Sequence, residues 1–234
     1  MRALIVGASG GLGAAFVALL AGDSRFSQVI GWSRSALPAS HDKVCTTPID
    51  LCDEATIKEA ARRLGEVDLV IIATGLLHDA DLKPEKTCRS LDPSMMKRVF
   101  EINTIGPALV AKHVLPLLPR DRRAVFAALS ARVGSISDNR SGGWHSYRAS
   151  KSALNQLIRC FSIELAAKRP QAICVGLHPG TVDTDLSKPY QAGVPDDKLF
   201  AAHQAARNLL GVLDSLTPLQ SGRVYDWAGV EIQA

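Results

Sequence analysis

A tyrosine and a lysine four residues apart are the pair in this sequence best suited to acid–base chemistry. Tyr147 and Lys151 lie in the run SYRASKSAL, and residues four apart share one face of a helix. A tyrosine, with a pKa of about 10, is a poor acid–base catalyst at neutral pH, but a nearby ammonium favours the phenolate and lowers that pKa. The pair therefore predicts proton transfer by Tyr147 to or from a substrate oxygen. On a solvated helix face the same pair would have no such role.

A glycine-rich turn near the N-terminus predicts a binding site for phosphate groups. Gly7, Gly11 and Gly13, with Ser9 and Leu12 among them, follow an apolar run and open a helical segment. Glycines there leave room for a pyrophosphate, which the free N–H groups and dipole of a helix N-terminus stabilise. Ordinary turns also use glycine, but the position between strand and helix favours a dinucleotide.

The end of the second expected strand carries a base where NAD-binding folds usually carry an acid. An Asp or Glu about 20 residues after the glycines binds the ribose 2′-hydroxyl of NAD, whereas this chain has Ser33, Arg34 and Ser35 there. Arg34 can pair with a 2′-phosphate and Ser33 can add a hydrogen bond, so NADP(H) is predicted over NAD(H). The alternative is a solvated arginine. Asp50 and Leu51, after the third strand, are expected beside the adenine, and Asp50 suits a helix N-cap as well.

Short apolar runs alternate with longer helical stretches along the chain. Strands are expected at Arg2–Val6, Gln28–Trp32, Lys43–Ile49, Asp68–Ala73, Ala124–Leu129, Ala172–Leu177 and Arg223–Trp227. Helices are expected at Leu12–Ala21, Glu54–Leu64, Ser94–Leu118 with a break near Gly106-Pro107, Ser146–Lys168 and Phe200–Leu213. This alternation is typical of a doubly wound α/β fold with helices on both faces. We expect a single Rossmann domain over residues 1–234, a seven-stranded parallel sheet in the order 3-2-1-4-5-6-7, and a substrate loop around residues 184–200.

Composition excludes several classes of protein. The 234 residues are 47% hydrophobic and 21% charged, which is typical of a globular chain with a sizeable core. A net charge of +4 without a clustered basic face does not indicate nucleic-acid binding. The uncharged stretch from Ala3 to Gly22 is broken by glycines, which disfavours a membrane span. Five cysteines without paired spacing predict a reduced, cytoplasmic chain and no metal site.

Together these residues resemble the short-chain dehydrogenase/reductase family, whose marks are Gly-x-x-x-Gly-x-Gly near the N-terminus and Tyr-x-x-x-Lys past the middle. Ala73-Thr74-Gly75 stands where the family has Asn-Ala-Gly, and Asn103 matches its helix asparagine. The run PGTVDT at 179–184 matches the segment at the nicotinamide end. Within the family, RVGSI at 132–136 and GGW at 142–144 resemble the C-factor and sniffer-like carbonyl reductase branch.

The resemblance implies hydride transfer between NADP(H) and a small carbonyl or alcohol. Tyr147 would protonate the carbonyl oxygen, Lys151 would lower the pKa of the phenol and hold the ribose, and Asn103 would position a water in a proton relay. Cofactor contacts are expected from Gly7, Ser9, Gly11, Leu12, Gly13, Ser33, Arg34, Asp50, Leu51, Ala73, Thr74, Gly75, Asn103, Tyr147, Lys151, Pro179, Gly180, Val182 and Thr184. A homodimer or homotetramer is expected, because related proteins often pair through the helix that carries Tyr147.

The serine that binds the substrate oxygen in this family has no clear counterpart. The best register puts Ala131 at its position, with Ser130 one residue off and Ser135 at nearly the usual distance from Tyr147. We take Ser130 as the catalytic candidate and Ser135 as the second, because a strand end can twist by one residue. The ambiguity leaves an alternative: a nucleotide-binding signalling or redox-sensing protein with little catalysis. A nucleotide-sugar epimerase or dehydratase fits poorly, since only a short tail follows Gly180.

Overall fold

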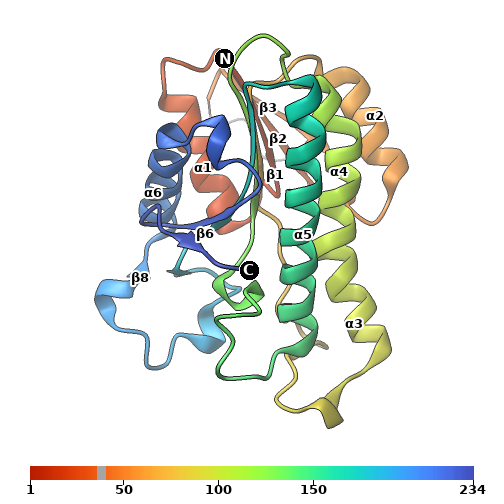
Figure 1. The fold of residues 1–234 in the computed structure, drawn as a ribbon, viewed down its shortest axis with the longest axis vertical. Helices are drawn as coiled ribbons and strands as arrows, with labels where there is room; N and C mark the ends of the chain where they lie inside the picture. Colours follow the sequence, from red (N-terminus) through yellow and green to blue (C-terminus); the bar gives the residue numbers. More distant parts are fainter. Residues whose placement is uncertain (36–40) are drawn as a thin grey trace.

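The computed structural model describes residues 1–35 and 41–234, which form a central sheet with helices on both faces (Figure 1). The sheet has eight strands in the order β10-β9-β6-β5-β4-β1-β2-β3. The seven parallel strands are β1 (Arg2–Val6), β2 (Gln28–Ser33), β3 (Val44–Pro48), β4 (Leu69–Ile72), β5 (Ala124–Leu129), β6 (Ala172–His178) and β9 (Val224–Asp226). The doubly wound α/β fold class and the predicted order of these seven strands are confirmed.

One edge strand was not predicted. β10 (Glu231–Ile232) runs antiparallel to β9 and closes the sheet after a tight turn. The carboxylate of Asp226 organises this turn by accepting from the N–H groups of Ala228 and Val230. A two-residue strand carries too little hydrophobic pattern to be recognised in a sequence. The same reason explains the unpredicted pair of β7 (Thr181–Val182) and β8 (Leu199–Phe200).

Alternating side chains of the strands bury two separate hydrophobic layers. Ala3 and Ile5 of β1 pack toward one face, whereas Leu4 and Val6 pack toward the other, because successive residues of a strand point in opposite directions. The first layer is covered by α1 (Gly11–Gly22) and α6 (Ala202–Ser215). The second is covered by α2 (Glu54–Leu64), α4 (Gly106–Val114) and α5 (His145–Lys168), as Figure 1 shows. Among the described residues, none of the helices has the length and apolar character needed to cross a bilayer.

The long helix expected at 94–118 is interrupted earlier than Gly106-Pro107. α3 (Pro93–Phe100) is followed by a π-helical turn at Glu101–Ile105, and α4 begins at Gly106. Pro107 has no N–H for the carbonyl of Asn103, and its ring crowds that carbonyl. The N–H of Gly106 reaches back to the carbonyl of Glu101 instead, five residues away. The widened turn carries the fully buried Asn103, and such turns frequently occur at functional sites.

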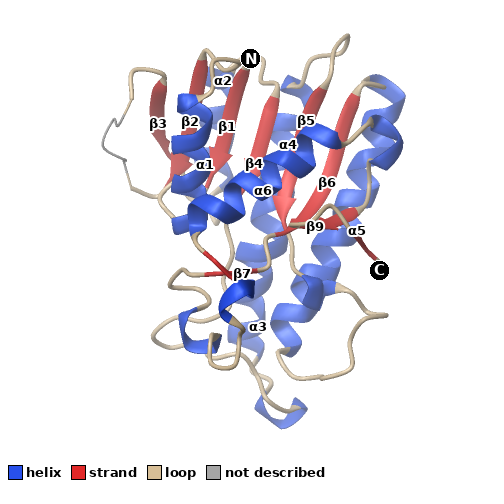
Figure 2. Cartoon of the chain, turned by 90° about the vertical axis from the view of Figure 1, so that its left-hand side faces the viewer, coloured by secondary structure: helices blue, strands red, loops and turns tan. Residues whose placement is uncertain are grey.

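The carboxyl ends of the parallel strands share one edge of the sheet, where three long connections leave it. These are residues 73–92 after β4, 130–144 after β5 and 179–201 after β6. Figure 2 shows them gathered with α3 and β7 beyond the strand ends. Ligands of doubly wound sheets bind outside this edge, so we expect the functional site there.

The glycine turn after β1 is held by backbone packed against backbone. A Cβ atom on Gly13 would lie 2.1 Å from the carbonyl oxygen of Gly7. Gly7 has a φ of +85°, and a Cβ there would lie 2.8 Å from the Thr74 methyl group. These positions require glycine because no rotation of a side chain can relieve a contact made by Cβ itself.

We therefore predict that Gly13→Ala lowers the free energy of unfolding by at least about 2 kcal/mol, because the added methyl group meets backbone. Gly22→Ala, at the end of the same helix, is the matched control, since a Cβ there meets nothing within 4 Å. It should leave stability unchanged or raise it by up to about 1 kcal/mol. Urea unfolding monitored by circular dichroism measures both, and equal stabilities of the two variants would contradict the packing described.

Candidate active site

A cleft of about 880 Å³ lies along the carboxyl ends of β1, β2, β3 and β4. Its walls contain about half of the predicted cofactor-binding residues: Gly7, Ser9, Ser33, Arg34, Asp50, Leu51, Ala73, Thr74 and Gly75. The sequence did not indicate the wall contributed by the α3 region, where Lys97, Arg98 and Glu101 line the cleft. No residue pattern could have placed α3 there, because its position depends on how the connection after β4 folds.

The start of α1 has the features that a pyrophosphate requires. Gly10 is the N-cap residue and provides no side-chain cap. The N–H of Gly10 donates back to the carbonyl of Gly7, and the first helical hydrogen bond runs from the N–H of Ala14 to the carbonyl of Gly10, so the amides between them have no helical acceptor. Nearby, the Thr74 hydroxyl is buried without a hydrogen-bond partner among the described residues. A free helix N-terminus, a glycine cradle and an orphaned hydroxyl fit a dinucleotide in this cleft.

The far end of the cleft carries the residues expected at the adenosine. Arg34 is exposed at the cleft wall, while the hydroxyl of Ser33 donates to the carbonyl of Ser35. The Asp50 carboxylate accepts from the N–H of Cys52. The residue that caps α2 is Asp53, not Asp50. The capping alternative for Asp50 was therefore wrong, because the chain makes one further turn before the helix starts.

Tyr147 and Lys151 lie buried in the first two turns of α5. Burial raises the pKa of Tyr147 to about 12 and lowers the pKa of Lys151 to about 8. The Lys151 ammonium is 5.7 Å from the centre of the Tyr147 ring and donates to the carbonyl of Leu129 at 2.8 Å. The sequence predicted that the lysine would lower the pKa of the tyrosine, but the loss of hydration on burial raises it instead. The phenol is thus fully protonated at neutral pH.

Asn103 joins the end of β4 to the helix that carries Tyr147. Its amide oxygen accepts from the N–H of Leu76 at 2.7 Å, and its amide nitrogen donates to the Leu76 carbonyl at 2.8 Å and to the Ser150 hydroxyl at 3.1 Å. The Ser150 hydroxyl donates in turn to the carbonyl of Tyr147. Both Asn103 and Lys151 place a polar atom within 4 Å of where Gly75 would carry a Cβ. The end of β4, the π-helical turn that carries Asn103 and the helix that carries Lys151 therefore meet beside Gly75.

Ala131 packs in the same buried apolar cluster as Tyr147, whereas the hydroxyls of the two candidate serines bind other residues. Ala131 forms a small buried cluster with Tyr147 and Leu77. The hydroxyl of Ser130 donates to the side-chain oxygen of Asn155 at 2.6 Å. The Ser135 hydroxyl accepts from the N–H of Asp138 and lies 3.3 Å from the Ser137 hydroxyl. Both candidate serines therefore have partners within the protein.

Aromatic side chains surround the phenol. The ring of Trp144 lies 6.2 Å from that of Tyr147 and 5.0 Å from that of Tyr190, centre to centre. The ring of His78, from the connection after β4, lies 5.5 Å from that of Tyr190, centre to centre. Its Nε2 is 3.1 Å from the carbonyl oxygens of both Asp185 and Leu186. Tyr190 and Leu186 lie within the expected substrate loop at 184–200, but the sequence singled out neither residue, because loop residues follow no periodic pattern.

The connection after β6 covers the Tyr147 end of the edge. A Leu186 methyl group lies 3.8 Å from the Cβ position of Gly75, and the Thr184 methyl group lies 2.8 Å from that of Gly11. Gly180, with a φ of +76°, packs against Phe200 and Trp227. Accordingly the open cleft does not include the other predicted cofactor contacts, namely Gly11, Leu12, Gly13, Asn103, Tyr147, Lys151, Pro179, Gly180, Val182 and Thr184.

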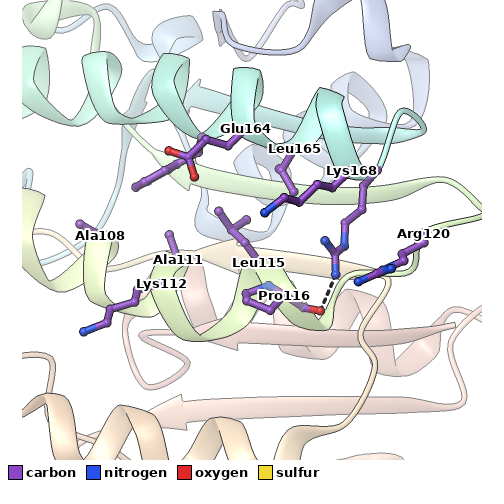
Figure 3. A pocket seen from close by; sticks show the side chains of 11 residues that line it. Ala108, Ala111, Lys112, Leu115, Pro116, Arg120, Glu164, Leu165 and Lys168 are labelled. Carbon is purple, nitrogen blue, oxygen red and sulfur yellow. Dashed lines mark hydrogen bonds between the residues drawn. The ribbon is translucent and has the colours of Figure 1, made fainter.

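A second cavity, of about 520 Å³, lies between α4 and α5, far along α5 from Tyr147 (Figure 3). Its floor is apolar, with Ala111, Leu115 and Leu165, and charged side chains including Lys112, Glu164 and Lys168 stand around it. It shares no residue with the cofactor cleft.

Comparison with known proteins decides the family. The model of the short chain dehydrogenase family matches residues 1–194. The chain belongs to this family. This short-chain dehydrogenase is 35% identical to the C-signal of Myxococcus xanthus over 191 residues, which cover 81% of this chain and 95% of that protein. It is 34% identical to 1-hydroxy-2-glutathionyl-2-methyl-3-butene dehydrogenase of Rhodococcus sp. (strain AD45), with coverage of 79% and 78%.

Solved structures agree with this assignment. The short-chain dehydrogenase superimposes on NADPH-bound carbonyl reductase from chicken fatty liver with a TM-score of 0.85 at 26% identity, covering 100% and 98% of the two chains. The carbonyl reductase Sniffer of D. melanogaster shares the fold with a TM-score of 0.87 at 22% identity and coverage of 100% and 99%. The predicted family and enzyme class are confirmed: the protein is an NAD(P)-dependent oxidoreductase acting on CH–OH or C=O groups.

Proposed function

We propose that this short-chain dehydrogenase reduces a small aldehyde or ketone with NADPH and that Tyr147 is its general acid. The observation that carries the proposal is the buried pair of Tyr147 and Lys151, whose ammonium lies 5.7 Å from the phenol ring and reaches Gly75 at the strand edge where the cofactor cleft ends. The phenol holds the proton that a carbonyl oxygen must receive, and the ammonium beside it favours the phenolate that remains. The similarity to an NADPH-bound carbonyl reductase supports the same direction.

The side chains of this protein account for the proton. The bound nicotinamide supplies the hydride that the carbonyl carbon receives. Tyr147 donates its proton to the carbonyl oxygen, and the Lys151 ammonium nearby stabilises the phenolate that remains. Lys151, whose burial lowers its pKa to about 8, loses a proton easily and can return one to the phenolate. Asn103 binds both the N–H and the carbonyl of Leu76, and we propose that it positions a relay water. Alcohol oxidation reverses each step.

Tyr147→Phe tests this proposal. Because the variant keeps the ring and loses only the proton donor, we predict a kcat for NADPH-dependent reduction lower by about 10²–10⁴-fold and unchanged NADPH binding. Cofactor absorbance over a panel of aldehydes and ketones gives the rates, and fluorescence titration gives the affinity. Tight NADPH binding by the wild-type protein without turnover of any compound would instead favour the signalling or redox-sensing alternative.

Arg34 is proposed to select NADPH by pairing with the 2′-phosphate. Its side chain is exposed at the cleft, and the described residues form no ion pair with it. We predict that Arg34→Ala weakens NADPH binding about 10- to 100-fold, as expected for a charge-assisted hydrogen bond, and leaves NADH binding unchanged. The matched control is Arg62→Ala, an exposed arginine on α2. Equal losses for NADPH and NADH would contradict the assignment.

The substrate-oxygen serine of the family is proposed to be absent, with Ala131 in its place. Ala131→Ser would direct a hydroxyl toward Tyr147, so we predict a kcat about 10-fold higher or more, the effect of one added donor to the developing oxyanion. Ser130→Ala should change kcat much less, since that hydroxyl already binds Asn155. A large loss of kcat in Ser130→Ala, with no gain in Ala131→Ser, would return the catalytic role to Ser130.

The segment at 184–200 is proposed to be the substrate loop. Leu186 and Tyr190 cover the Tyr147 end, and His78 binds the loop backbone. These residues must move for a substrate to reach the phenol, and they then close the apolar side of its pocket. The pocket so formed suits a small carbonyl compound with an apolar body.

A homodimer is proposed to form through α4 and α5. The cavity between these helices has an apolar floor and carries both Glu164 and lysine side chains (Figure 3). A two-fold axis through this surface would set Glu164 of one copy beside a lysine of the other and bury the apolar floor between them. We predict a dimer by analytical ultracentrifugation and a monomer for Glu164→Lys. A monomeric wild-type protein would contradict this arrangement.

We also propose a cytoplasmic location. All five cysteines are free thiols. Four of them are exposed, and exposed thiols persist in a reducing compartment.

A further inference from the structure

The helix that carries Tyr147 begins without a cap of its own. Trp144 is the N-cap residue of α5, and its side chain makes no capping hydrogen bond. It has a φ of +50° and a ψ of +41°, a left-handed conformation that non-glycine residues rarely adopt. Gly142 and Gly143 also have positive φ angles. Glycine adopts such angles without strain, so Trp144 is the residue whose conformation needs support from elsewhere in the protein.

Glu85 supplies that support from the connection after β4. Its backbone carbonyl accepts from the N–H of Trp144. Its carboxylate accepts from the N–H of Ser146 at 3.2 Å and from the Ser146 hydroxyl. Glu85 therefore binds Trp144 and Ser146, the residues on either side of His145, and Ser146 directly precedes Tyr147.

The carboxylate is buried and has no basic partner. Glu85 is 7% exposed, and the ion pairs formed by residues 1–35 and 41–234 do not include it. A buried charge must be compensated. Here the positive end of the α5 dipole and the two donors of Ser146 compensate it. A polar group placed at that cost next to Tyr147 suggests a role in setting the tyrosine's position.

We propose that Glu85 is a positioning residue for Tyr147, an inference that rests on the proposed reductase function. Near its start, the connection that carries Glu85 is held against α5 by Asn103, which binds Leu76 and Ser150. Glu85 attaches the same connection to α5 a second time, at its first turn. These two attachments fix the first turn of α5, which bears Tyr147, relative to the carboxyl end of β4, where the cofactor cleft ends.

Trp144 extends the effect to the pocket wall. Its ring packs edge to face against both Tyr147 and Tyr190. Without the Glu85 carboxylate the Ser146 contacts are lost and only the backbone bond between Glu85 and Trp144 remains, so this wall and the phenol shift together. A displacement of about 1 Å in a catalytic group can cost about 10²-fold in rate, so a small movement suffices for a large effect.

Glu85→Ala, Glu85→Gln and a control separate positioning from simple stabilisation. The glutamine can still accept from the Ser146 N–H and can donate to the Ser146 hydroxyl, so it keeps both contacts. Asp92→Ala is the control, because Asp92 caps α3 through the same kind of contacts, with Ser94 and Met95. For each variant kcat and the KM for NADPH are measured under conditions where circular dichroism shows a folded protein.

We expect Glu85→Ala to lower kcat at least about 10-fold with a KM for NADPH within about 2-fold of wild type, since Glu85 and Ser146 do not line the cofactor cleft. Glu85→Gln should recover most of the rate, and Asp92→Ala should keep it. A kcat for Glu85→Ala within about 2-fold of wild type, or an equal loss in Asp92→Ala, would overturn the proposal.

A second readout does not depend on activity. With ¹⁹F-labelled tryptophan, the Trp144 resonance, assigned by Trp144→Phe, should shift or broaden in Glu85→Ala and stay unchanged in Asp92→Ala. If no substrate is turned over, the proposed reductase function fails, while this signal still tests whether Glu85 holds the turn. An unchanged Trp144 resonance in Glu85→Ala would show that Glu85 does not position it.

Discussion

The close contact of backbone with backbone at the glycine turn is the constraint on which the site depends. Gly13 packs on the carbonyl of Gly7, and Gly7 packs on the end of β4 at Ala73 and Thr74. Because β1 lies between β2 and β4, this contact brings the start of α1 to the centre of the carboxyl edge. Ser9 and Gly10, which lead into α1, then line the same cleft as Arg34 and Gly75. Any side chain at these glycines would separate the phosphate cradle from the strand end that carries the chemistry.

The chemistry itself depends on burial. Tyr147 and Lys151 are enclosed by α3, the π-helical turn and the loop at 184–190, and the loss of hydration moves their pKa values in opposite directions. The phenolate thereby becomes the stronger base of the two, so that after a substrate oxygen takes the phenolic proton it can recover one from the Lys151 ammonium. The polar links from Asn103 through Ser150 and from Glu85 to Ser146 hold this buried pair in place. The proposed proton transfer thus depends on the first two turns of α5 and on the segments carrying Asn103 and Glu85 that hold them in place.

Local signals made much of this fold predictable from the sequence. Continuous apolar runs gave the parallel strands, and glycine spacing placed the turn, because both depend on neighbouring residues alone. The position of Asn103 in a π-helical turn depends on the missing N–H of Pro107. The proline was visible in the sequence, but the helix was expected to break near Gly106-Pro107 itself and not in the turn before it. The sequence register already placed Ala131 at the substrate-oxygen position, but Trp144, Tyr190 and Glu85 meet Tyr147 or its helix only through the folding of long connections, which carry no periodic pattern. The pKa of Tyr147 was mispredicted because burial is a tertiary property.

A crystal structure with bound NADP⁺ tests the central claim most directly. We predict the diphosphate on the amides that open α1, the 2′-phosphate at Arg34 and the nicotinamide ring beside the Tyr147 hydroxyl, with Leu186 displaced from its place over Gly75. A dinucleotide bound elsewhere, or a nicotinamide ring that leaves Tyr147 covered by Leu186 and Tyr190, would contradict the account.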